Sequence, residues 1–232
     1  TPMLVNCVLL SYNRPTWLRH ALLSVSAQTH SDYRLIVMDE STIFDVEKVV
    51  EEFMLRKVDI VKVKVPPEER SRRNPVGANM NTALSMISEG LVCSLCDDDY
   101  FYPTWFAAAS RHFEENPDHH AGFGILNYSK DPEMRMSPLT QWGRRFFYQP
   151  VTDPFCKLDH TQVVHRVFNP PYRWPEEFDK IKEPDAYYFR EIAQKYPFYP
   201  IQELAVVKRD HEKALRWNVK AIQDGTLDPS RE

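Results

Sequence analysis

Strand-like apolar runs alternate with helix-periodic segments through the first half of the chain, and this alternation constrains the fold more than any other feature. Apolar runs occupy residues 5–10, 35–38, 58–65 and 91–96, and segments with helical spacing occupy residues 16–27, 46–55 and 78–87. Several of these strands are apolar without interruption, which is typical of parallel sheets covered by helices on both faces. The sequence therefore predicts an α/β fold with a mainly parallel sheet flanked by helices.

The second half of the chain is less regular. We expect a helix over residues 103–115, a strand over 122–128, a helix over 185–195 and a strand over 198–207. Residues 129–154 have no clean period but many aromatic residues, so we interpret them as a partly ordered loop over a cleft. We expect a single domain over residues 1–222, followed by a flexible tail over 223–232.

Composition narrows the class of protein. The chain has 232 residues, 43% of them hydrophobic, and a net charge of -4, which fits one globular domain and argues against a general nucleic-acid coat. No apolar stretch approaches the ~20 residues of a membrane-spanning helix, so we expect no transmembrane segment. The expected localisation is cytoplasmic, with peripheral membrane contact as the alternative.

The four cysteines include the pair Cys93 and Cys96, whose C-x-x-C spacing is also found in redox and zinc sites. Both lie inside the run over residues 91–96, where side chains three positions apart point to opposite faces of a strand. We therefore expect reduced cysteines in an intracellular core rather than a metal or redox centre.

Three consecutive carboxylates, Asp97, Asp98 and Asp99, follow the strand-like run over residues 91–96. Carboxylates gathered at one strand end repel one another unless a cation or a set of donors neutralises them, and a divalent metal is the simplest solution. The carboxyl ends of strands are also where open α/β sheets bind ligands. The alternative is that the run merely caps a helix opened by Pro103.

Two common nucleotide motifs are missing from the chain. The segment after the first strand reads Ser11, Tyr12, Asn13, Arg14, Pro15 instead of G-x-G-x-x-G, and no G-x-x-x-x-G-K-[ST] is present. A phosphate must then be met by a metal, by arginines or by a helix N-terminus. Asp39 ends the second strand, where it either accepts hydrogen bonds from a base or ribose or acts as a turn and cap residue.

Five motifs in order resemble the family 2 glycosyltransferases, which have the GT-A fold. They are ALLSVSAQTHSDYRLIVMDEST over 21–42, GANMNTAL over 77–84, the aspartates 97–99 with Pro103, EPD with the helix to Ile192 over 183–192, and VKRDH over 207–211. The resemblance covers almost the whole chain. It implies a GT-A domain whose residues 1–99 form a nucleotide-sugar-binding half and whose residues 100–222 form an acceptor-binding half.

The resemblance implies an inverting transfer of a sugar from a nucleoside diphosphate sugar, with a UDP-sugar as first choice, to an acceptor hydroxyl. Residues expected to bind the nucleotide sugar are Ser11, Asn13, Arg14, Asp39, Gly77, Asn81, Asp97 and Asp98. Asp97 and Asp99 would ligate Mn²⁺ or Mg²⁺, with His211 completing the shell unless it is a surface histidine. Asp98, between them on an extended chain, would point the other way.

Proton removal from the acceptor hydroxyl requires a carboxylate in such a transfer. We choose Asp185, which is also placed as a helix cap, and hold Glu183 in reserve. Aromatic residues expected either to stack on a ligand or to pack in the core are Trp142, Phe147, Tyr148 and Trp174.

The chain departs from the family pattern at four positions, with Met80 for Arg, Ala83 for Gly, Glu40 for a second Asp, and Pro184 inside the usual Glu-Asp. Met80 removes an expected diphosphate-binding arginine, which Arg72 or Arg73 could replace unless these belong to a solvated loop.

Two other functions share parts of this pattern. A sugar-1-phosphate nucleotidyltransferase has a similar sheet and metal carboxylates, but its glycine-rich signature is absent here. A non-catalytic module that binds nucleotide sugars or glycans is the third interpretation. The acceptor stays open among a glycan, a lipid, a protein and a nucleic-acid base.

Overall fold

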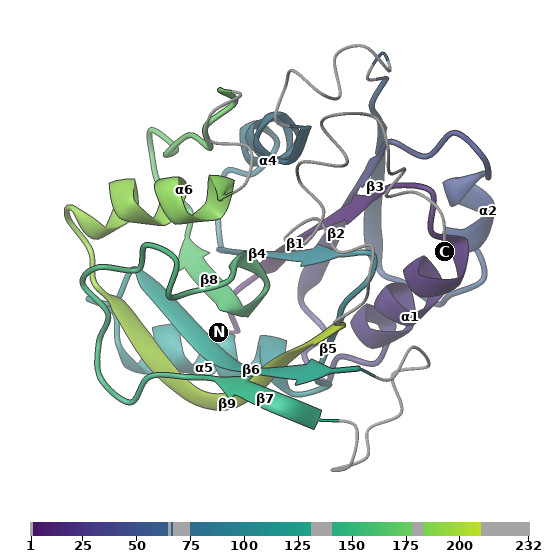
Figure 1. The fold of residues 1–232 in the computed structure, drawn as a ribbon. Helices are drawn as coiled ribbons and strands as arrows, with labels where there is room; N and C mark the ends of the chain where they lie inside the picture. The colour runs from purple at the N-terminus through teal and green to yellow at the C-terminus, as the bar shows by residue number, and fades with distance from the viewer. Residues whose placement is uncertain (1, 65, 67–74, 131–140, 178–182, 210–232) are drawn as a thin grey trace.

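One continuous sheet of nine strands forms the centre of the protein (Figure 1). The computed structural model describes residues 2–64, 66, 75–130, 141–177 and 183–209. The strands are β1 (Val5–Ser11), β2 (Tyr33–Asp39), β3 (Lys57–Lys62), β4 (Leu91–Cys96), β5 (Tyr100–Phe101), β6 (Ala121–Ser129), β7 (Gln141–Arg145), β8 (Val163–Arg166) and β9 (Phe198–Arg209). Their order is β3-β2-β1-β4-β8-β6-β9-β5, and β7 pairs with β6.

Helices flank this sheet. They are α1 (Pro15–Ser26), α2 (Val46–Val50), α4 (Pro75–Ser85), α5 (Trp105–Glu115), α6 (Pro184–Ala193) and the 3₁₀ helix η1 (His160–Gln162). The expected helix over residues 46–55 ends early, at Val50. Only Val46, Val49 and Val50 are buried in it, and the amide of Glu52 bonds to the carbonyl of Val49, which closes the turn toward β3.

The first four strands of the sheet, in the order β3-β2-β1-β4, are all parallel. The side chains of β1 and β2 are almost all buried, as continuous apolar strands between two helical layers require. In register, Ser11 lies opposite Asp39 and Leu10 opposite Cys96, so these three strands end at one edge. The chain leaves β1 toward β2 on one side and returns to β4 on the other, which creates a topological switch point.

The second half extends the same sheet with mixed pairing. β8 is antiparallel to both β4 and β6, and β7 is antiparallel to β6, whereas β6 and β9 are parallel. β5 pairs antiparallel with β9, where Tyr100 lies opposite Val207, so the end of β9 reaches the acidic turn that precedes β5. The predicted α/β fold with a sheet flanked by helices is thus present, and the antiparallel strands extend the parallel part of that sheet.

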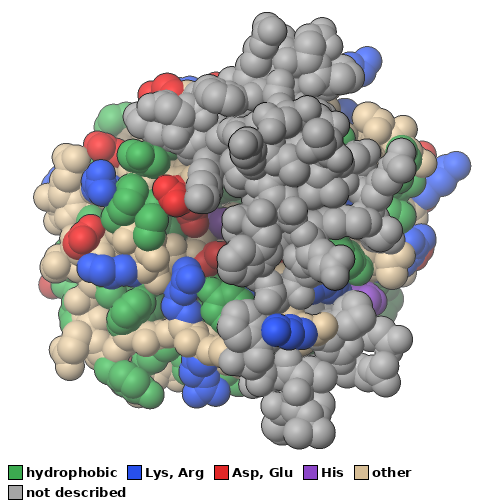
Figure 2. All heavy atoms as spheres, viewed as in Figure 1, with side chains coloured by type: hydrophobic (Ala, Val, Ile, Leu, Met, Phe, Trp, Pro, Cys, Tyr) green, Lys and Arg blue, Asp and Glu red, His purple; other side chains and the backbone are tan. Residues whose placement is uncertain are grey.

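Two hydrophobic layers lie on opposite faces of the sheet. One face packs against α1, α2 and α5, and the other packs against α4 and α6, which lie together at the top of Figure 1. On the face shown in Figure 2, the side chains that are not grey mix hydrophobic, acidic and basic types without one large basic patch. Within the described residues, no helix combines the length and the apolar character needed to cross a bilayer.

Gly124 marks a close approach between β6, β9 and α5. A Cβ atom built on Gly124 would lie 2.6 Å from Cβ of Ala205 and 2.6 Å from Cζ3 of Trp105, both of which are buried. We expect Gly124→Ala to lower the free energy of unfolding by about 1–3 kcal/mol, because a buried ring must move. Urea unfolding followed by circular dichroism measures this change.

Gly143 on β7 is the matched control, because the nearest atom to its added Cβ, Cδ2 of Tyr128, lies at 3.4 Å. Gly143→Ala should change the free energy of unfolding by no more than about 0.5 kcal/mol. Equal losses for the two variants would contradict this account of the packing at Gly124.

Candidate active site

The carboxyl ends of β1, β2 and β4 meet at the switch point of the sheet and bring the predicted acidic residues together. The amide of Asp97 donates to the carbonyl of Leu10 at 3.0 Å, and the amide of Glu40 donates to the carbonyl of Ser11 at 3.0 Å. The loops that follow β2 and β4 are therefore held by main-chain hydrogen bonds to β1, at the centre of the sheet. This edge is the place where open α/β sheets bind ligands.

Asn13 fastens the loop after β1 to the loop after β2. Its side-chain Oδ1 accepts from the main-chain amides of Thr42 and Ile43 at 2.7 and 3.2 Å. The main-chain amide of Asn13 donates to Ser41 Oγ at 3.1 Å. The φ angle of Asn13 is 54°, in the left-handed region that asparagine tolerates better than most residues. The two loops thus form one rigid wall beside Asp39.

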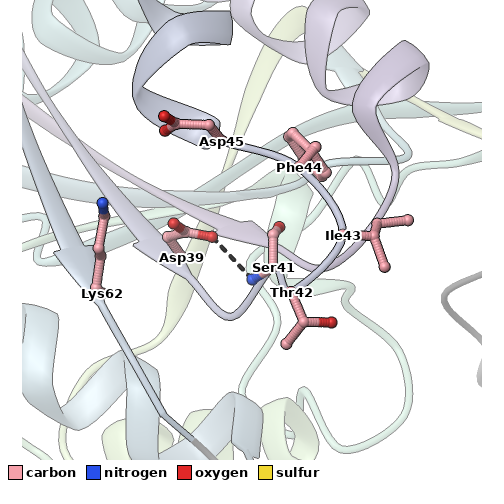
Figure 3. A pocket seen from close by; sticks show the side chains of 7 residues that line it. All are labelled: Asp39, Ser41, Thr42, Ile43, Phe44, Asp45 and Lys62. Atoms are coloured by element: carbon pink, nitrogen blue, oxygen red, sulfur yellow. Dashed lines mark hydrogen bonds between the residues drawn. The ribbon is translucent and has the colours of Figure 1, made fainter.

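A shallow cavity of about 410 Å³ lies beside this wall, at the ends of β2 and β3 (Figure 3). It is lined by Asp39, Ser41, Thr42, Ile43, Phe44, Asp45 and Lys62. Asp39 accepts from the amide of Ser41 at 2.8 Å, and burial raises the pKa of its carboxyl although this hydrogen bond opposes the shift. The side chain of Lys62 stands next to Asp39 on the neighbouring strand (Figure 3). The cavity therefore offers an acceptor and a cation next to apolar side chains.

Arg14 neutralises part of the acidic turn. Its Nη1 lies 3.0 Å from Asp97 Oδ1 and 2.9 Å from Asp98 Oδ2, and the amide of Tyr12 donates to Asp97 Oδ2 at 2.7 Å. Burial alone would lower the pKa of Arg14, but the carboxylates of Asp98 and Asp97 raise it above its ordinary value. A cation and an amide donor thus hold both oxygens of Asp97.

Asp98 and Asp99 converge with Cys96 instead. Cys96 Sγ and one carboxylate oxygen from each aspartate lie within 4.8 Å of one another. The expectation of an extended chain at Asp98 is wrong, because residues 97 and 98 form a turn that brings the side chain of Asp98 to both Arg14 and Asp99. The assignment of Asp97 and Asp99 as metal ligands stays a prediction.

The chemistry of this group fits a divalent metal. Asp99 Oδ1 accepts from the amide of Arg209 at 2.9 Å, whereas its buried Oδ2 has no hydrogen-bond partner among the described residues. Two carboxylates supply the hard oxygen ligands that Mg²⁺ and Mn²⁺ prefer. Burial raises the pKa of the Cys96 thiol well above its usual value, so the thiol adds little to a magnesium site.

A second acidic group lies beside the first and shares one lysine with it. Lys208 Nζ, on β9, lies 2.8 Å from Asp159 Oδ2 and 3.5 Å from Asp99 Oδ2. Asp159 precedes η1 and forms a capping box with Gln162, in which its Oδ1 accepts from Thr161. Burial would raise the pKa of Asp159, but the ammonium of Lys208 overcomes this effect and holds that pKa well below its usual range.

Asp185 lies in the first turn of α6, close to Asp159. Its Oδ1 accepts from the amide of Ala186 at 3.0 Å. Burial first, and then the carboxylate of Asp159, raise the pKa of Asp185 to about 6, although Lys208 opposes the shift. Glu183 occupies the N-cap position without a side-chain cap bond. Asp185 is therefore the partly buried and electrostatically perturbed carboxylate of this helix start.

His160 connects the two acidic groups through its position on η1. Its Nδ1 lies 2.8 Å from Ser94 Oγ and its Nε2 lies 3.5 Å from Cys96 Sγ. Burial lowers the pKa of His160 to about 4, so the ring is neutral at pH 7. His160 holds η1, and with it Asp159, against β4.

Asn81 and Gly77, both expected to contact the nucleotide sugar, lie on α4. The side chain of Asn81 donates to the carbonyl of Trp174 at 3.0 Å, accepts from the amide of Trp174 at 2.8 Å, and donates to Glu176 Oε1 at 2.8 Å. Gly77 is buried within α4. These contacts tie α4 to the segment before α6 and place Asn81 in the scaffold.

Several predicted residues fall outside the described residues. They are His211, Arg72, Arg73, the tail over residues 223–232 and the side chain of Trp142. Of the remaining aromatic candidates, Trp174 is buried and stacks on Tyr188 at a centroid distance of 4.7 Å, which is a core role. Tyr148 is 74% exposed and Phe147 is 36% exposed, so these two rings are accessible to a ligand.

Sequence reasoning missed Asp159, His160, Lys62 and Lys208. Asp159 and Gln162 had a recognisable signal, since an acidic residue three positions before Gln is typical of a capping box. Lys208 directly follows the apolar end of the strand predicted over residues 198–207, and a charged residue at such a position is rarely buried without a partner. Neither signal identifies which carboxylate pairs with which lysine.

Known proteins share this fold and sequence pattern. The mixed sheet with an acidic turn at its switch point defines a protein of the GT-A fold class. The model of the family described as glycosyl transferase family 2 matches residues 7–170, which is most of the chain. The chain belongs to glycosyl transferase family 2, as its motifs predicted.

The individual proteins that resemble this chain have low sequence identity to it. Protein CgeD of Bacillus subtilis is 24% identical over 211 residues, which cover 86% of this chain and 48% of CgeD, so the chain spans about half the length of this curated relative. The crystal structure of S. aureus TarS 1-349 in complex with UDP-GlcNAc is similar with a TM-score of 0.63 and 15% identity, over 90% of this chain and 59% of that one. The crystal structure of TarS 1-349 in complex with UDP has a TM-score of 0.61 and 15% identity, over 91% of this chain and 62% of that one. These structures share the fold.

The contacts of Asn81 predict a scaffold role that can be tested. We expect Asn81→Ala to lower the free energy of unfolding by about 1–3 kcal/mol and to change the affinity for UDP by less than about twofold. Thr82→Ala, at the exposed neighbouring position, is the control and should have little effect on either quantity. Reduced UDP affinity at unchanged stability would instead place Asn81 in the nucleotide site.

Proposed function

We propose that the chain transfers a sugar from a nucleoside diphosphate sugar, with UDP as the nucleotide, to an acceptor hydroxyl, in a reaction that needs a divalent metal and inverts the anomeric centre. One observation carries this proposal: a row of polar groups follows the strand ends from Asp39 to Asp159, and the carboxylate of Asp159 acts electrostatically on Asp185. Ser41 and Ser11 join Asp39 to β1, Tyr12 joins β1 to Asp97, and Lys208 joins Asp99 to Asp159. A nucleotide end, a diphosphate centre and a proton acceptor then follow in the order that transfer requires.

The cavity beside Asp39 suits a uracil ring. Uracil presents one N–H donor between two carbonyl oxygens, and Asp39 is an acceptor with the ammonium of Lys62 nearby. Ile43 is 68% exposed and supplies apolar area for a ring face. The UDP and UDP-GlcNAc complexes of TarS, a protein with the same fold, support a uridine nucleotide.

Among the described residues, Asp99 would hold the metal together with Asp98, which takes the place of the predicted Asp97 because Arg14 and Tyr12 already hold both oxygens of Asp97. When bound, a divalent cation stabilises the negative charge that develops on the departing diphosphate. The guanidinium of Arg14 is fixed by Asp97 and Asp98, so it adds positive charge at a set position without reorganising. His211 is the proposed further ligand in the segment after β9.

Asp185 is the proposed base. A carboxyl whose pKa is about 6 is mostly ionised at pH 7 and still binds a proton more readily than an ordinary aspartate. The acceptor proton would move to Asp185 as the hydroxyl oxygen attacks the sugar carbon. Asp159 and Lys208 act electrostatically on Asp185, and Lys208 also contacts Asp99, so the proposed base lies near the proposed metal site.

The role of Asp39 is testable with Asp39→Asn. The amide oxygen of the variant can still accept from the main-chain amide of Ser41. Its NH2 group, however, is a donor and cannot accept the uracil N–H, so UDP affinity should fall by about 1–3 kcal/mol at little cost in stability. Calorimetry measures the affinity. Asp45→Asn is the control, because Asp45 lines the same cavity as an N-cap, where Asn serves equally well. A loss of stability without a loss of affinity would make Asp39 a structural residue.

Asp185→Asn separates catalysis from helix capping. It should preserve the fold and the donor affinity and lower turnover by about 10²–10⁴-fold, since only the proton acceptor is lost. In the parent protein, kcat/KM should fall as pH drops below about 6 and level off above it, because the base must be ionised. This profile should disappear in the variant.

The charged side chains that set this pH dependence are Asp159 from η1 and Lys208 from β9. Near-normal turnover of Asp185→Asn would transfer the role of base to Glu183. A product that keeps the anomeric configuration of the donor would end the proposal of inversion.

A further inference from the structure

We propose that Lys208 is a resident cation that competes with the divalent metal for Asp99, so that the free protein binds metal weakly and binds it tightly only together with the diphosphate. This inference rests on the metal dependence proposed above. It assigns a role to a lysine that lies between the donor side and the base side of the site.

The atom for which the two cations would compete is Asp99 Oδ2. Oδ1 of the same carboxylate is already bonded to the amide of Arg209, and Oδ2 has no hydrogen bond among the described residues. Lys208 Nζ lies 3.5 Å from Oδ2, too long for a good hydrogen bond but close enough for a strong charge interaction at a buried position. A metal bound to Oδ2 would therefore lie close to a positive charge.

Asp159 prevents Lys208 from moving away. Its Oδ2 lies 2.8 Å from Nζ, while its Oδ1 accepts from both the amide and the hydroxyl of Thr161. The side chain of Lys208 is only 18% exposed. The ammonium is thus held more closely by Asp159 than by Asp99, so the site keeps one fixed positive charge.

A fixed charge of this kind couples the metal to the nucleotide. Without a diphosphate, a divalent cation and the ammonium repel each other across one carboxylate. The negative charges of a diphosphate compensate both cations, so its binding should raise the affinity for metal. By linkage, metal should raise the affinity for UDP by the same factor.

The test measures Mn²⁺ binding to the full chain by the electron paramagnetic resonance signal of free Mn²⁺, first without and then with UDP. Lys208→Met should tighten Mn²⁺ binding without nucleotide by about tenfold or more and reduce the enhancement by UDP. Lys208→Arg keeps the charge and should behave like the parent. Lys157→Met, which removes a half-exposed lysine paired with Asp153, should change the Mn²⁺ affinity by less than about twofold.

Lys208→Met leaves two buried carboxylates without their lysine and is expected to be less stable. The double variant Lys208→Met with Asp159→Asn removes one positive and one negative charge. We expect it to regain part of the stability that Lys208→Met loses, and thermal unfolding measures this gain. Its Mn²⁺ affinity without nucleotide should also exceed that of the parent, because the ammonium has gone while Asp99 remains.

The outcomes separate this inference from the proposed function. Unchanged or weaker Mn²⁺ binding in folded Lys208→Met and in the double variant would overturn the inference if UDP binding to the parent still requires Mn²⁺ and Asp99. If the parent and the variants bind no Mn²⁺ either with or without UDP, the metal dependence itself is wrong and the inference fails with it.

Discussion

The burial of several carboxylates at one edge of the sheet is the constraint on which the rest of the structure depends. Asp97, Asp98 and Asp99 follow β4, and the protein compensates them with two basic side chains from opposite ends of the chain, Arg14 and Lys208. Unpaired charges at such depth are strongly destabilising. The acidic turn therefore requires that the loop before α1 and the end of β9 both be in place, and the same pairing gives the site its fixed electrostatic pattern.

The sequence predicts the fold correctly where the hydrophobic pattern is local and strong. The runs that became β1, β2 and β4 are buried on both faces, so their period and length identify them in one sequence. β5, β7 and β8 were missed. β5 and β8 have only two and four residues, β8 carries His165 and Arg166, and β7 lies in the stretch over residues 129–154 that was interpreted as a loop. Strands of this kind are stabilised by their neighbours in the sheet, and that information lies far away in the sequence.

The site was predictable to the same degree. The rule that ligands bind at the carboxyl ends of strands placed Asp39 and Asp97–Asp99 at one edge, and the family resemblance added Asp185. The partners of these residues could not be predicted, because ion pairs such as Lys208 with Asp159 join segments that share no local pattern. Asn81 shows that a motif position does not by itself identify a ligand contact. Its side chain is hydrogen-bonded to the main chain of Trp174.

The pairing of β9 with β5, next to the acidic turn, also has a consequence for biosynthesis. Asp99 accepts a hydrogen bond from the amide of Arg209, which lies 110 positions later in the chain, and Lys208 directly precedes that arginine. During translation the acidic turn is therefore synthesised long before β9, which carries the lysine that compensates the charge of Asp99. Residues 1–99 would emerge with buried charge only half compensated, so the nascent chain should stay open at this edge until β9 is released. The acidic turn and β9, which are far apart in the sequence, are on this basis completed together during folding.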